Sequence, residues 1–200
     1  RRRHTRSFHV TGVQTCALPI CRIVLKFSEN NEPVKPPSLI VSIHPKDTKS
    51  WTGNFQLGTG SLDTVIDHPD GKNIVVVAHG LAYVIDPHTR LLDMVMGDGF
   101  EYLVPVPAMN LLLVSNGLGF DAVRDGKLVW ESKRISWFGF RGLMVAGNFL
   151  VGEAFSSLSD RWYRFKLDLN TGECNDGIYE REAAQFTKVM PEGPPPSQTP

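Results

Sequence analysis

The fold of this chain is indicated most clearly by the stretch Ile74-Val75-Val76-Val77-Ala78-His79-Gly80-Leu81-Ala82-Tyr83-Val84-Ile85. Two apolar runs rich in β-branched residues flank a His-Gly dipeptide, which is the pattern of a strand, a tight turn and a second strand. Glycine supplies the positive φ angle that a two-residue hairpin turn needs. The stretch therefore predicts a β-hairpin whose turn is His79-Gly80.

The same unit of strand, turn and strand recurs along the chain. Apart from a weak turn or two at Tyr179–Phe186, no amphipathic helical pattern of useful length competes with it, so the sequence predicts an all-β fold. An Asn-Gly dipeptide is a strong hairpin signal because a type I′ turn needs positive φ at both central residues. The further turns expected are Asn116-Gly117 between Leu111–Ser115 and Leu118–Val123, Asp125-Gly126 before Lys127–Glu131, and Gly147-Asn148 between Leu143–Val145 and Phe149–Val151.

The unit also repeats at a fixed distance. The segment Ile74–Asp93 aligns without a gap on Leu111–Trp130 at an offset of 37 residues (111 − 74). A third copy runs from Phe149 to Asp168, with the hairpin loop enlarged by Ala154–Arg161. A further copy is expected from Leu39–Ile43 and Phe55–Leu57.

A period near forty residues with about four strands is typical of β-propeller blades. Propellers generally have four to eight blades. Three or four copies therefore predict β-propeller-like repeats of antiparallel meanders in an incomplete propeller. A small open β-meander sandwich is the alternative.

One blade carries a family resemblance. His68-Pro69-Asp70-Gly71-Lys72-Asn73-Ile74-Val75-Val76-Val77, followed by Tyr83-Val84-Ile85-Asp86-Pro87-His88-Thr89, resembles the repeats of bacterial YVTN-type and WD40-like β-propellers. The resemblance extends over about residues 62–172, and Leu167–Gly172 is also similar to quinoprotein-type blades. It implies a propeller-like fold and marks no active site, since such propellers host many functions.

The N-terminal residues have a different origin. Val10–Ile20 resembles the translation of a common short-read sequencing adapter, and Arg1–Arg6 fits the flow-cell end of the same adapter. We therefore expect residues 1–20 to be artefactual and disordered, and the native sequence to begin at Arg22 with its true start missing.

The rest of the chain divides by composition. Residues 21–38 are expected to form an N-terminal fragment and a proline-rich linker, because prolines remove backbone donors. Residues 39–180 are expected to form the propeller-like domain. Residues 181–200 end in a proline-rich sequence that is typical of a disordered tail.

Composition excludes some functions. The chain has 21 basic and 21 acidic residues, and removing the four arginines of residues 1–20 leaves 17 (21 − 4) against 21, a net charge of −4. A basic footprint for nucleic acid is therefore absent. No apolar run approaches the length of about 18 residues needed to span a bilayer. Cys174 is the one secure native cysteine, which leaves the compartment open, with a cytoplasmic one favoured.

One blade concentrates acids and imidazoles: Asp63, Asp67, His68, Asp70 and His79. Such side chains could hold a metal ion, and a hydrolytic site would use them. The favoured interpretation is turn chemistry, since Asp67–Gly71 has the composition of a turn and His79 lies at a hairpin tip. If Asp63, His68, His79 and Asp86 converged on one point, the metal-hydrolase interpretation would gain support.

Arginines and aromatic residues concentrate in one part of the chain: Arg134, Trp137, Phe138, Phe140, Arg141, Arg161, Trp162, Tyr163 and Arg164. Packing between blades is the commoner role of such aromatics, but the same residue types also dominate protein interfaces. The candidate partner surface is Trp137, Phe138, Arg141, Arg161 and Trp162, because the expected insertion at Ala154–Arg161 would build a binding loop beside it.

The sequence thus favours a non-catalytic β-propeller-like binding or scaffolding module. Its expected partner is another protein, with neither nucleic acid nor membrane involved. We assign no catalytic residue, no metal and no cofactor, because no Gly-x-Ser-x-Gly or His-Glu-x-x-His spacing is present. The alternative is a fragment of a propeller enzyme, either a metal-dependent hydrolase or a degenerate quinoprotein.

Overall fold

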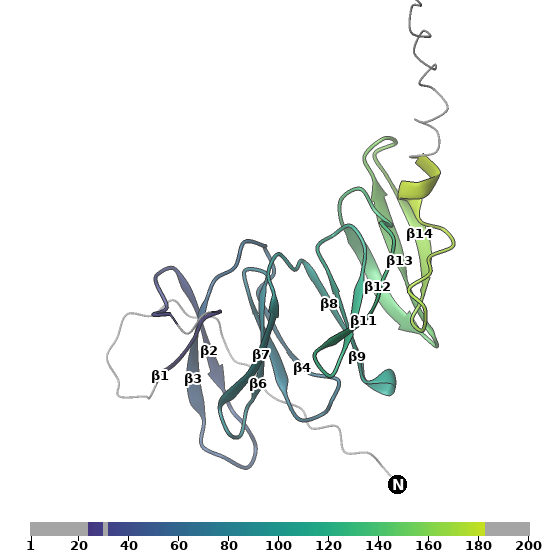
Figure 1. The fold of residues 1–200 in the computed structure, drawn as a ribbon. Helices are drawn as coiled ribbons and strands as arrows, with labels where there is room; N and C mark the ends of the chain where they lie inside the picture. The colour runs from purple at the N-terminus through teal and green to yellow at the C-terminus, as the bar shows by residue number, and fades with distance from the viewer. Residues whose placement is uncertain (1–23, 30–31, 183–200) are drawn as a thin grey trace, which may run out of the picture. The chain divides into compact units, whose positions relative to one another are not determined.

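The computed structural model describes residues 24–29 and 32–182, and it is almost entirely β-structure (Figure 1). The all-β fold class is therefore confirmed. The chain forms two compact units, Arg1–Glu131 and Ser132–Pro200, which are described separately below. The expectations for residues 1–20 and for the tail beyond residue 182 concern residues outside the described ones. No helix of the described residues is long and apolar enough to cross a membrane.

The first unit contains three sheets, named A, B and C here. Sheet A has the strand order β1-β3-β2, sheet B the order β4-β5-β6-β7, and sheet C the order β11-β10-β9-β8. A short 3₁₀ helix, η1 (Pro107–Met109), joins β8 to β9. The strands are β1 (Val24–Phe27), β2 (Ser38–Ile43), β3 (Trp51–Gln56), β4 (Thr64–Asp67), β5 (Ile74–Ala78), β6 (Leu81–Asp86), β7 (Leu91–Gly97), β8 (Tyr102–Val106), β9 (Leu111–Ser115), β10 (Asp121–Arg124) and β11 (Lys127–Glu131).

Sheets B and C are successive copies of one antiparallel meander. Their first strands begin at Thr64 and Tyr102, a spacing of 38 residues (102 − 64). Their second strands begin at Ile74 and Leu111, which is the predicted offset of 37 (111 − 74). The repeat expected from the sequence is therefore present as two four-stranded sheets.

Two of the predicted hairpin turns in this unit are confirmed by their backbone angles. His79 and Gly80 have φ values of 47° and 83°, and Asp125 and Gly126 have φ values of 48° and 71°. Positive φ at both central residues is the signature of a type I′ turn. The register agrees, since Ala78 pairs with Leu81 and Arg124 pairs with Lys127.

The prediction of a tight turn at Asn116-Gly117 is wrong. Asp121 pairs with Val114, and a five-residue loop (residues 116–120) joins β9 to β10. Within it, Ser115 Oγ accepts the Gly117 N–H at 3.0 Å and Asn116 Oδ1 accepts the Leu118 N–H at 3.2 Å. Such local bonds from side chain to backbone offer the chain an alternative to ladder pairing. They explain why the strand starts three residues later than the repeat predicts.

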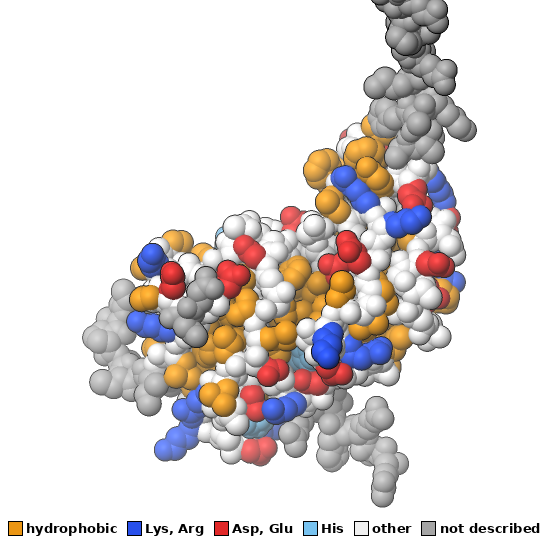
Figure 2. All heavy atoms as spheres, in the orientation of Figure 1, with side chains coloured by type: hydrophobic (Ala, Val, Ile, Leu, Met, Phe, Trp, Pro, Cys, Tyr) orange, Lys and Arg blue, Asp and Glu red, His pale blue; other side chains and the backbone are white. Residues whose placement is uncertain are grey.

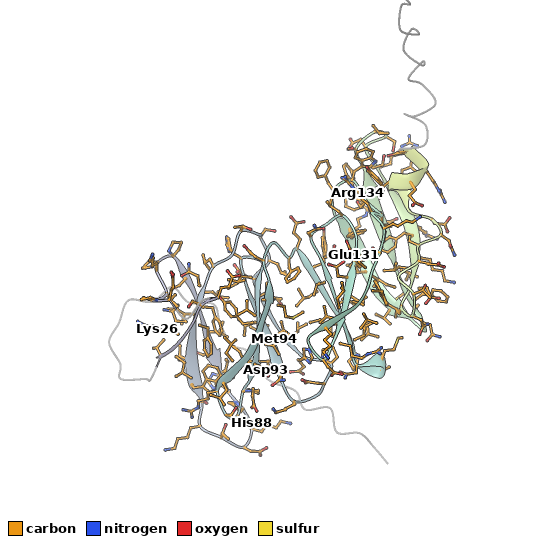
Figure 3. The ribbon with its side chains drawn as sticks, viewed as in Figure 1. Lys26, His88, Asp93, Met94, Glu131 and Arg134 are labelled. Atoms are coloured by element: carbon orange, nitrogen blue, oxygen red, sulfur yellow. The ribbon has the colours of Figure 1, made fainter. Side chains whose placement is uncertain are left out.

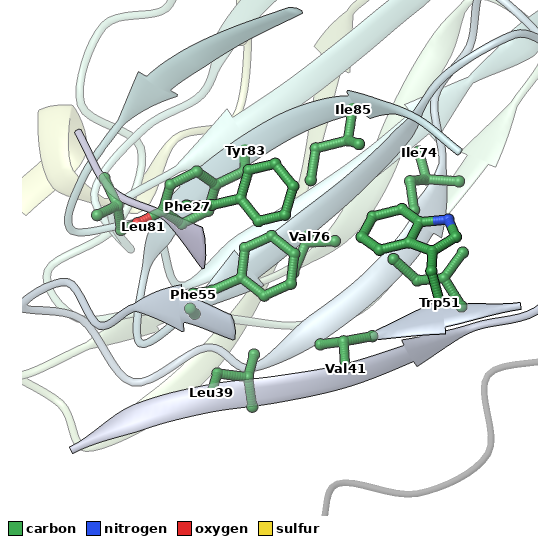
Figure 4. Close-up of a cluster of buried hydrophobic side chains, with 12 residues drawn as sticks. Phe27, Leu39, Val41, Trp51, Phe55, Ile74, Val76, Leu81, Tyr83 and Ile85 are labelled. Atoms are coloured by element: carbon green, nitrogen blue, oxygen red, sulfur yellow. The ribbon is translucent and has the colours of Figure 1, made fainter. Parts of the chain in front are cut away.

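The core of the first unit lies between its sheets. Side chains of sheet A pack on one face of sheet B, and a second cluster joins the other face of sheet B to sheet C. The rings of Phe27 and Phe55 are stacked with their centres 4.8 Å apart, and the ring centres of Phe55 and Tyr83 are 5.3 Å apart (Figure 4). Because both of its faces are covered, sheet B buries every residue of β5 and β6.

Strand β1 contributes to this core from ahead of the expected domain start at residue 39. It pairs in parallel with β3, from Val24 opposite Thr52 to Phe27 opposite Phe55. Phe27 is 6% exposed and touches both Trp51 and Phe55.

The second unit contains sheet D, with the strand order β12-β13-β14. Its strands are β12 (Phe140–Ala146), β13 (Phe149–Ser156) and β14 (Arg161–Asp168), and a helical turn covers residues 178–182 (Figure 1). Strand β12 begins 38 residues after β8 (140 − 102), so this sheet continues the repeat along the sequence. The Gly147-Asn148 hairpin is confirmed, with Ala146 opposite Phe149.

The expected loop insertion at Ala154–Arg161 is wrong. Ala154 pairs with Tyr163, Phe155 with Trp162 and Ser156 with Arg161, so the additional residues lengthen both strands. Only four residues, 157–160, form the turn. This part of the chain therefore forms paired strands and contains no inserted loop that could build a binding face.

Candidate functional site

The acids and histidines of sheet B do not gather at one point. His79 Nδ1 lies 3.3 Å from Asp63 Oδ2, whereas His68 Nδ1 lies 3.0 Å from Asp70 Oδ2. These two pairs lie at opposite ends of β5, whose five residues span about 13 Å at 3.3 Å per residue. No group of three or more potential metal ligands occurs in the described part of the chain. The convergence that would support a metal-dependent hydrolase is absent here.

The carboxylate of Asp70 serves to form the turn that precedes β5. Asp70 Oδ1 accepts the backbone N–H groups of Lys72 at 2.8 Å and Asn73 at 2.9 Å. Burial alone would raise the pKa of Asp70, but these N–H donors and the nearby His68 hold the pKa below its ordinary value. The carboxylate thus stabilises the turn before β5 in its charged form.

A corner after β6 uses the same chemistry. Asp86 Oδ1 accepts the N–H groups of His88 at 2.9 Å and Thr89 at 3.2 Å, while Lys72 Nζ lies 3.3 Å from Asp86 Oδ2. Burial acts to raise the pKa of Asp86, yet these backbone donors and Lys72 leave it below its ordinary value. Asp86 is therefore committed to this corner, at which Figure 3 labels His88.

Cys174 has the environment of a packed thiol. Burial raises its pKa, so the thiol is protonated at neutral pH, whereas reactivity requires the thiolate. Its backbone forms a bridge with Leu167 at the end of β14. Its position serves the structure of sheet D.

The predicted surface residues all belong to the second unit, where Trp137 belongs to one cluster of side chains and Arg141 and Trp162 belong to another. The first, called the Trp137 cluster here, comprises Arg134, Trp137, Ser156, Tyr179 and Glu182. The Trp137 indole N–H donates to Glu182 Oε2 at 2.6 Å, and the Ser156 hydroxyl donates to Glu182 Oε1 at 2.5 Å. The buried carboxylate therefore ties the helical turn of residues 178–182 to the sheet.

Arg134 completes the Trp137 cluster and is labelled in Figure 3. Its guanidinium lies 4.3 Å from the Tyr179 ring centre and 5.2 Å from that of Trp137. It also donates to the carbonyl groups of Ser136 at 3.0 Å and Trp137 at 3.1 Å. Since these groups are already satisfied within the unit, the Trp137 cluster has a structural role.

The second cluster, called the Trp162 surface here, comprises Arg141, Glu153, Phe155 and Trp162. The Arg141 guanidinium lies 4.6 Å from the Trp162 ring centre, and its Nε donates to Glu153 Oε2 at 2.6 Å. The rings of Phe155 and Trp162 are 5.1 Å apart and tilted by 54°. All four side chains are partly or fully exposed, so this cluster presents an aromatic and charged patch to solvent.

A β-bulge places Arg141 in this surface. Counted from the Gly147-Asn148 turn without a bulge, Arg141 would face Ala154, on the buried side of the sheet. The register shifts between Arg141 and Met144, so that Arg141 instead pairs with Glu153. Gly142, with φ of 62°, lies within this shift. A glycine at positive φ is a recognised element of such bulges.

The remaining predicted residues, Phe138 and Arg161, belong to neither cluster. Phe138 is 68% exposed, which makes it one of the most exposed large apolar side chains among the described residues. Arg161 is exposed but pairs with Ser156, and it lies on the opposite face of β14 from its neighbour Trp162. The structure thus brings Arg141 and Trp162 together, engages the Trp137 side chain with Glu182 and places Arg161 on the opposite face of β14.

Sequence reasoning missed Glu153, Phe155, Tyr179 and Glu182. Glu153 lies beside the segment Ala154–Arg161 and Phe155 lies within it. The sequence predicts a loop insertion for that segment and therefore no strand pairing there. Glu182 was assigned to the tail. The glycine at position 142 was the one available signal for the bulge, since an isolated glycine in a strand pattern suggests one.

Charges of both signs are mixed on the side of the described surface that Figure 2 shows. Figure 2 shows basic and acidic side chains interspersed, with no extensive patch of one sign on the side in view.

Comparison of the chain with protein-family models, with curated proteins and with solved structures finds no match in any of the three. We therefore infer the function from the geometry of the two units.

Proposed function

We propose that this protein is a non-catalytic binding or scaffolding module built from β-propeller-like repeats, and that it binds another protein through the Trp162 surface. The observation that carries the proposal is the exposed stack of Arg141 on Trp162, supported by Phe155 and by the ion pair with Glu153. Tryptophan and arginine are the residue types most enriched at the energetic centres of protein interfaces.

The stack is held in place before any partner binds. Arg141 is fixed on one side by Glu153 and on the other by the indole, so little side-chain freedom remains to be lost on binding. The guanidinium still has donors beyond the Nε bonded to Glu153, which a partner's carboxylate or carbonyl group can accept. Such prior ordering favours recognition over a purely structural role.

The repeat pattern supports the module type. Residues 62–172 resemble YVTN-type and WD40-like blades, and repeats of this kind serve widely as binding platforms. Asp70 and Asp86 of the first unit are engaged in a turn and a corner, and the site offered to a partner lies in the second unit. The proposal is therefore a binding function on a repeat scaffold.

The test is capture of partners by immobilised protein, followed by identification of the bound proteins. The variant Arg141→Ala combined with Trp162→Ala removes the stack, and Arg124→Ala removes an exposed arginine of the first unit as a matched control. We expect the control to retain the partners and the double variant to lose them, with an affinity change of tenfold or more for a central interface pair. Equal capture by all three proteins would contradict the proposal.

A further inference from the structure

Sheet D has one strand fewer than the sheets that precede it in the repeat. In sheets B and C the third strands, β6 and β10, are each flanked by a fourth strand, β7 or β11. Among the described residues, the third strand of sheet D, β14, has only β13 as a full ladder partner. Strand β14 is consequently an edge where the repeat would place an interior strand.

The chain starts the fourth strand and then leaves it. In sheet B, Leu91 opens β7 opposite Asp86. In sheet D the Asp168 N–H donates to the Glu173 carbonyl group at 2.9 Å, and Leu167 forms an isolated bridge with Cys174. The chain then turns into the helix of residues 178–182, whose Tyr179 N–H donates to the Ile135 carbonyl group at 3.1 Å.

The part of β14 before this bridge has backbone groups that face outward. The Asp168 N–H points away from β13, because it is bonded to Glu173. Backbone groups of a strand alternate in direction, so the N–H and C=O groups of Trp162 and Arg164 also face the outer edge. Within the described residues, no strand pairs with this edge at those two positions.

The open edge also carries uncompensated positive charge. Arg161 and Arg164 are both exposed, and neither takes part in an ion pair with another described residue. Glu153 lies opposite Arg164 in the register but is bonded to Arg141. The Lys166 ammonium group lies 3.7 Å from the Phe149 ring centre. Two guanidinium groups thus remain for a ligand.

We infer that the open edge of β14 binds an extended, acidic segment of a partner protein by strand addition. The inference rests on the proposed protein-binding function and adds its mode and the chemistry of the partner. Main-chain hydrogen bonds would supply affinity at Trp162 and Arg164, and carboxylates beside the two arginines would supply selectivity. The same arginines disfavour pairing with a second copy of β14, since like charges on an edge oppose self-association.

The test uses the whole chain and a fluorescein-labelled peptide of about six residues, the usual length of a strand, with glutamate at its second and fifth positions and valine elsewhere. Glutamates spaced in this way face opposite sides of a strand, as do Arg161 and Arg164 in β14. Its matched control replaces each glutamate by lysine. We expect fluorescence anisotropy to detect binding of the glutamate peptide only. Arg164→Glu should abolish that binding, whereas Arg124→Glu, which changes net charge equally at an exposed position of the first unit, should preserve it.

Two substitutions at one position separate charge from backbone pairing. Arg164→Ala removes the guanidinium alone, and Arg164→Pro also removes the outward N–H without breaking a bond to β13. We expect Arg164→Ala to weaken peptide binding about threefold and Arg164→Pro about tenfold or more, from one further lost hydrogen bond. If Arg164→Pro lowers the melting temperature sharply, two N-methylated peptides take its place in the test. One is methylated at its odd-numbered residues and the other at its even-numbered residues. Because only alternate N–H groups of the peptide would face β14, only one of the two peptides should fail to bind.

Equal affinity of the Arg164→Ala and Arg164→Pro variants, or of the two methylated peptides, would overturn strand addition. Dimerisation of the wild-type protein that Arg164→Pro abolishes would assign the edge to a second copy and would also overturn the inference. Retained capture of partners through the Trp162 surface without peptide binding would leave the proposed function intact and remove this inference alone.

Discussion

Sheets B and D follow the same local rules and differ in what surrounds them. Each has a corner in which an aspartate, Asp86 or Asp168, accepts the N–H of the residue two positions later, at 2.9 Å and 2.7 Å. Yet β6 is buried at every residue, whereas β14 is buried only at Phe165 and Leu167. Local sequence therefore sets the hairpins and corners, and neighbouring elements set burial. The candidate binding features lie in the sheet whose meander is incomplete.

The largest expected difference between the two sheets concerns aromatic side chains. Tyr83 is fully buried, contacts Phe55 and donates its hydroxyl to the Gln56 carbonyl group at 2.9 Å. Tyr83→Ala should lower the free energy of unfolding by about 3–5 kcal/mol, as expected for large cavities. Trp162→Ala, at a partly exposed position, should cost about 1 kcal/mol or less. Urea unfolding of both variants measures the contrast, and equal losses would show that Trp162 is a core residue.

Much of this fold could be predicted because its signals are local. The His79-Gly80 and Asp125-Gly126 turns and the offset between β5 and β9 follow from residue type and spacing alone. The longer loop that replaces the expected tight turn at Asn116-Gly117 could not be predicted, since local side-chain bonds of Ser115 and Asn116 decide it.

The candidate site was harder to predict because it depends on register. A one-residue bulge at Gly142 moves Arg141 from the Ala154 side to the Glu153 side of the sheet. A shift of one residue exchanges the two faces of a strand, so composition alone cannot place such a residue. The buried Glu182 depends on contacts 26 and 45 residues away, with Ser156 and Trp137, which no local pattern reveals.

A smaller effect is expected at two glycines that have positive φ in hairpin turns. Gly80 lies between β5 and β6 of sheet B, and Gly147 lies between β12 and β13 of sheet D. A Cβ at Gly80 would lie 2.8 Å from the Gly60 Cα and 3.0 Å from the Phe100 N, whereas a Cβ at Gly147 would meet nothing within 4 Å. Gly147→Ala should cost about 1 kcal/mol from backbone strain alone. Gly80→Ala should cost about 2–3 kcal/mol, because backbone atoms must also move. Equal costs in thermal unfolding would mean that the crowding around Gly80 is relieved without penalty.

The Asp86 corner gives a pH-dependent contribution. Its pKa lies below the ordinary value of 3.8, so the charged form stabilises the folded protein above that value, and the contribution is lost as the pH falls through the folded pKa. Asp86→Asn should cost about 1 kcal/mol at pH 7. The difference between wild type and variant should shrink below about pH 4. Unfolding measured at both pH values tests this, and a difference that stays constant would exclude the carboxylate as its source.

The smallest expected effect concerns the access of solvent to two indoles in the folded protein. Trp51 is 4% exposed and donates its N–H to the Pro87 carbonyl group at 2.9 Å, whereas Trp162 is partly exposed beneath Arg141. Acrylamide should therefore quench Trp162 more strongly than Trp51. Trp162→Phe should remove an accessible part of the emission and lower the Stern–Volmer slope, while Trp51→Phe should remove a protected part and raise it. If Trp162→Phe leaves the slope unchanged or raises it, the indole is sequestered in solution, and the Trp162 surface must be reassigned to the packing of sheet D.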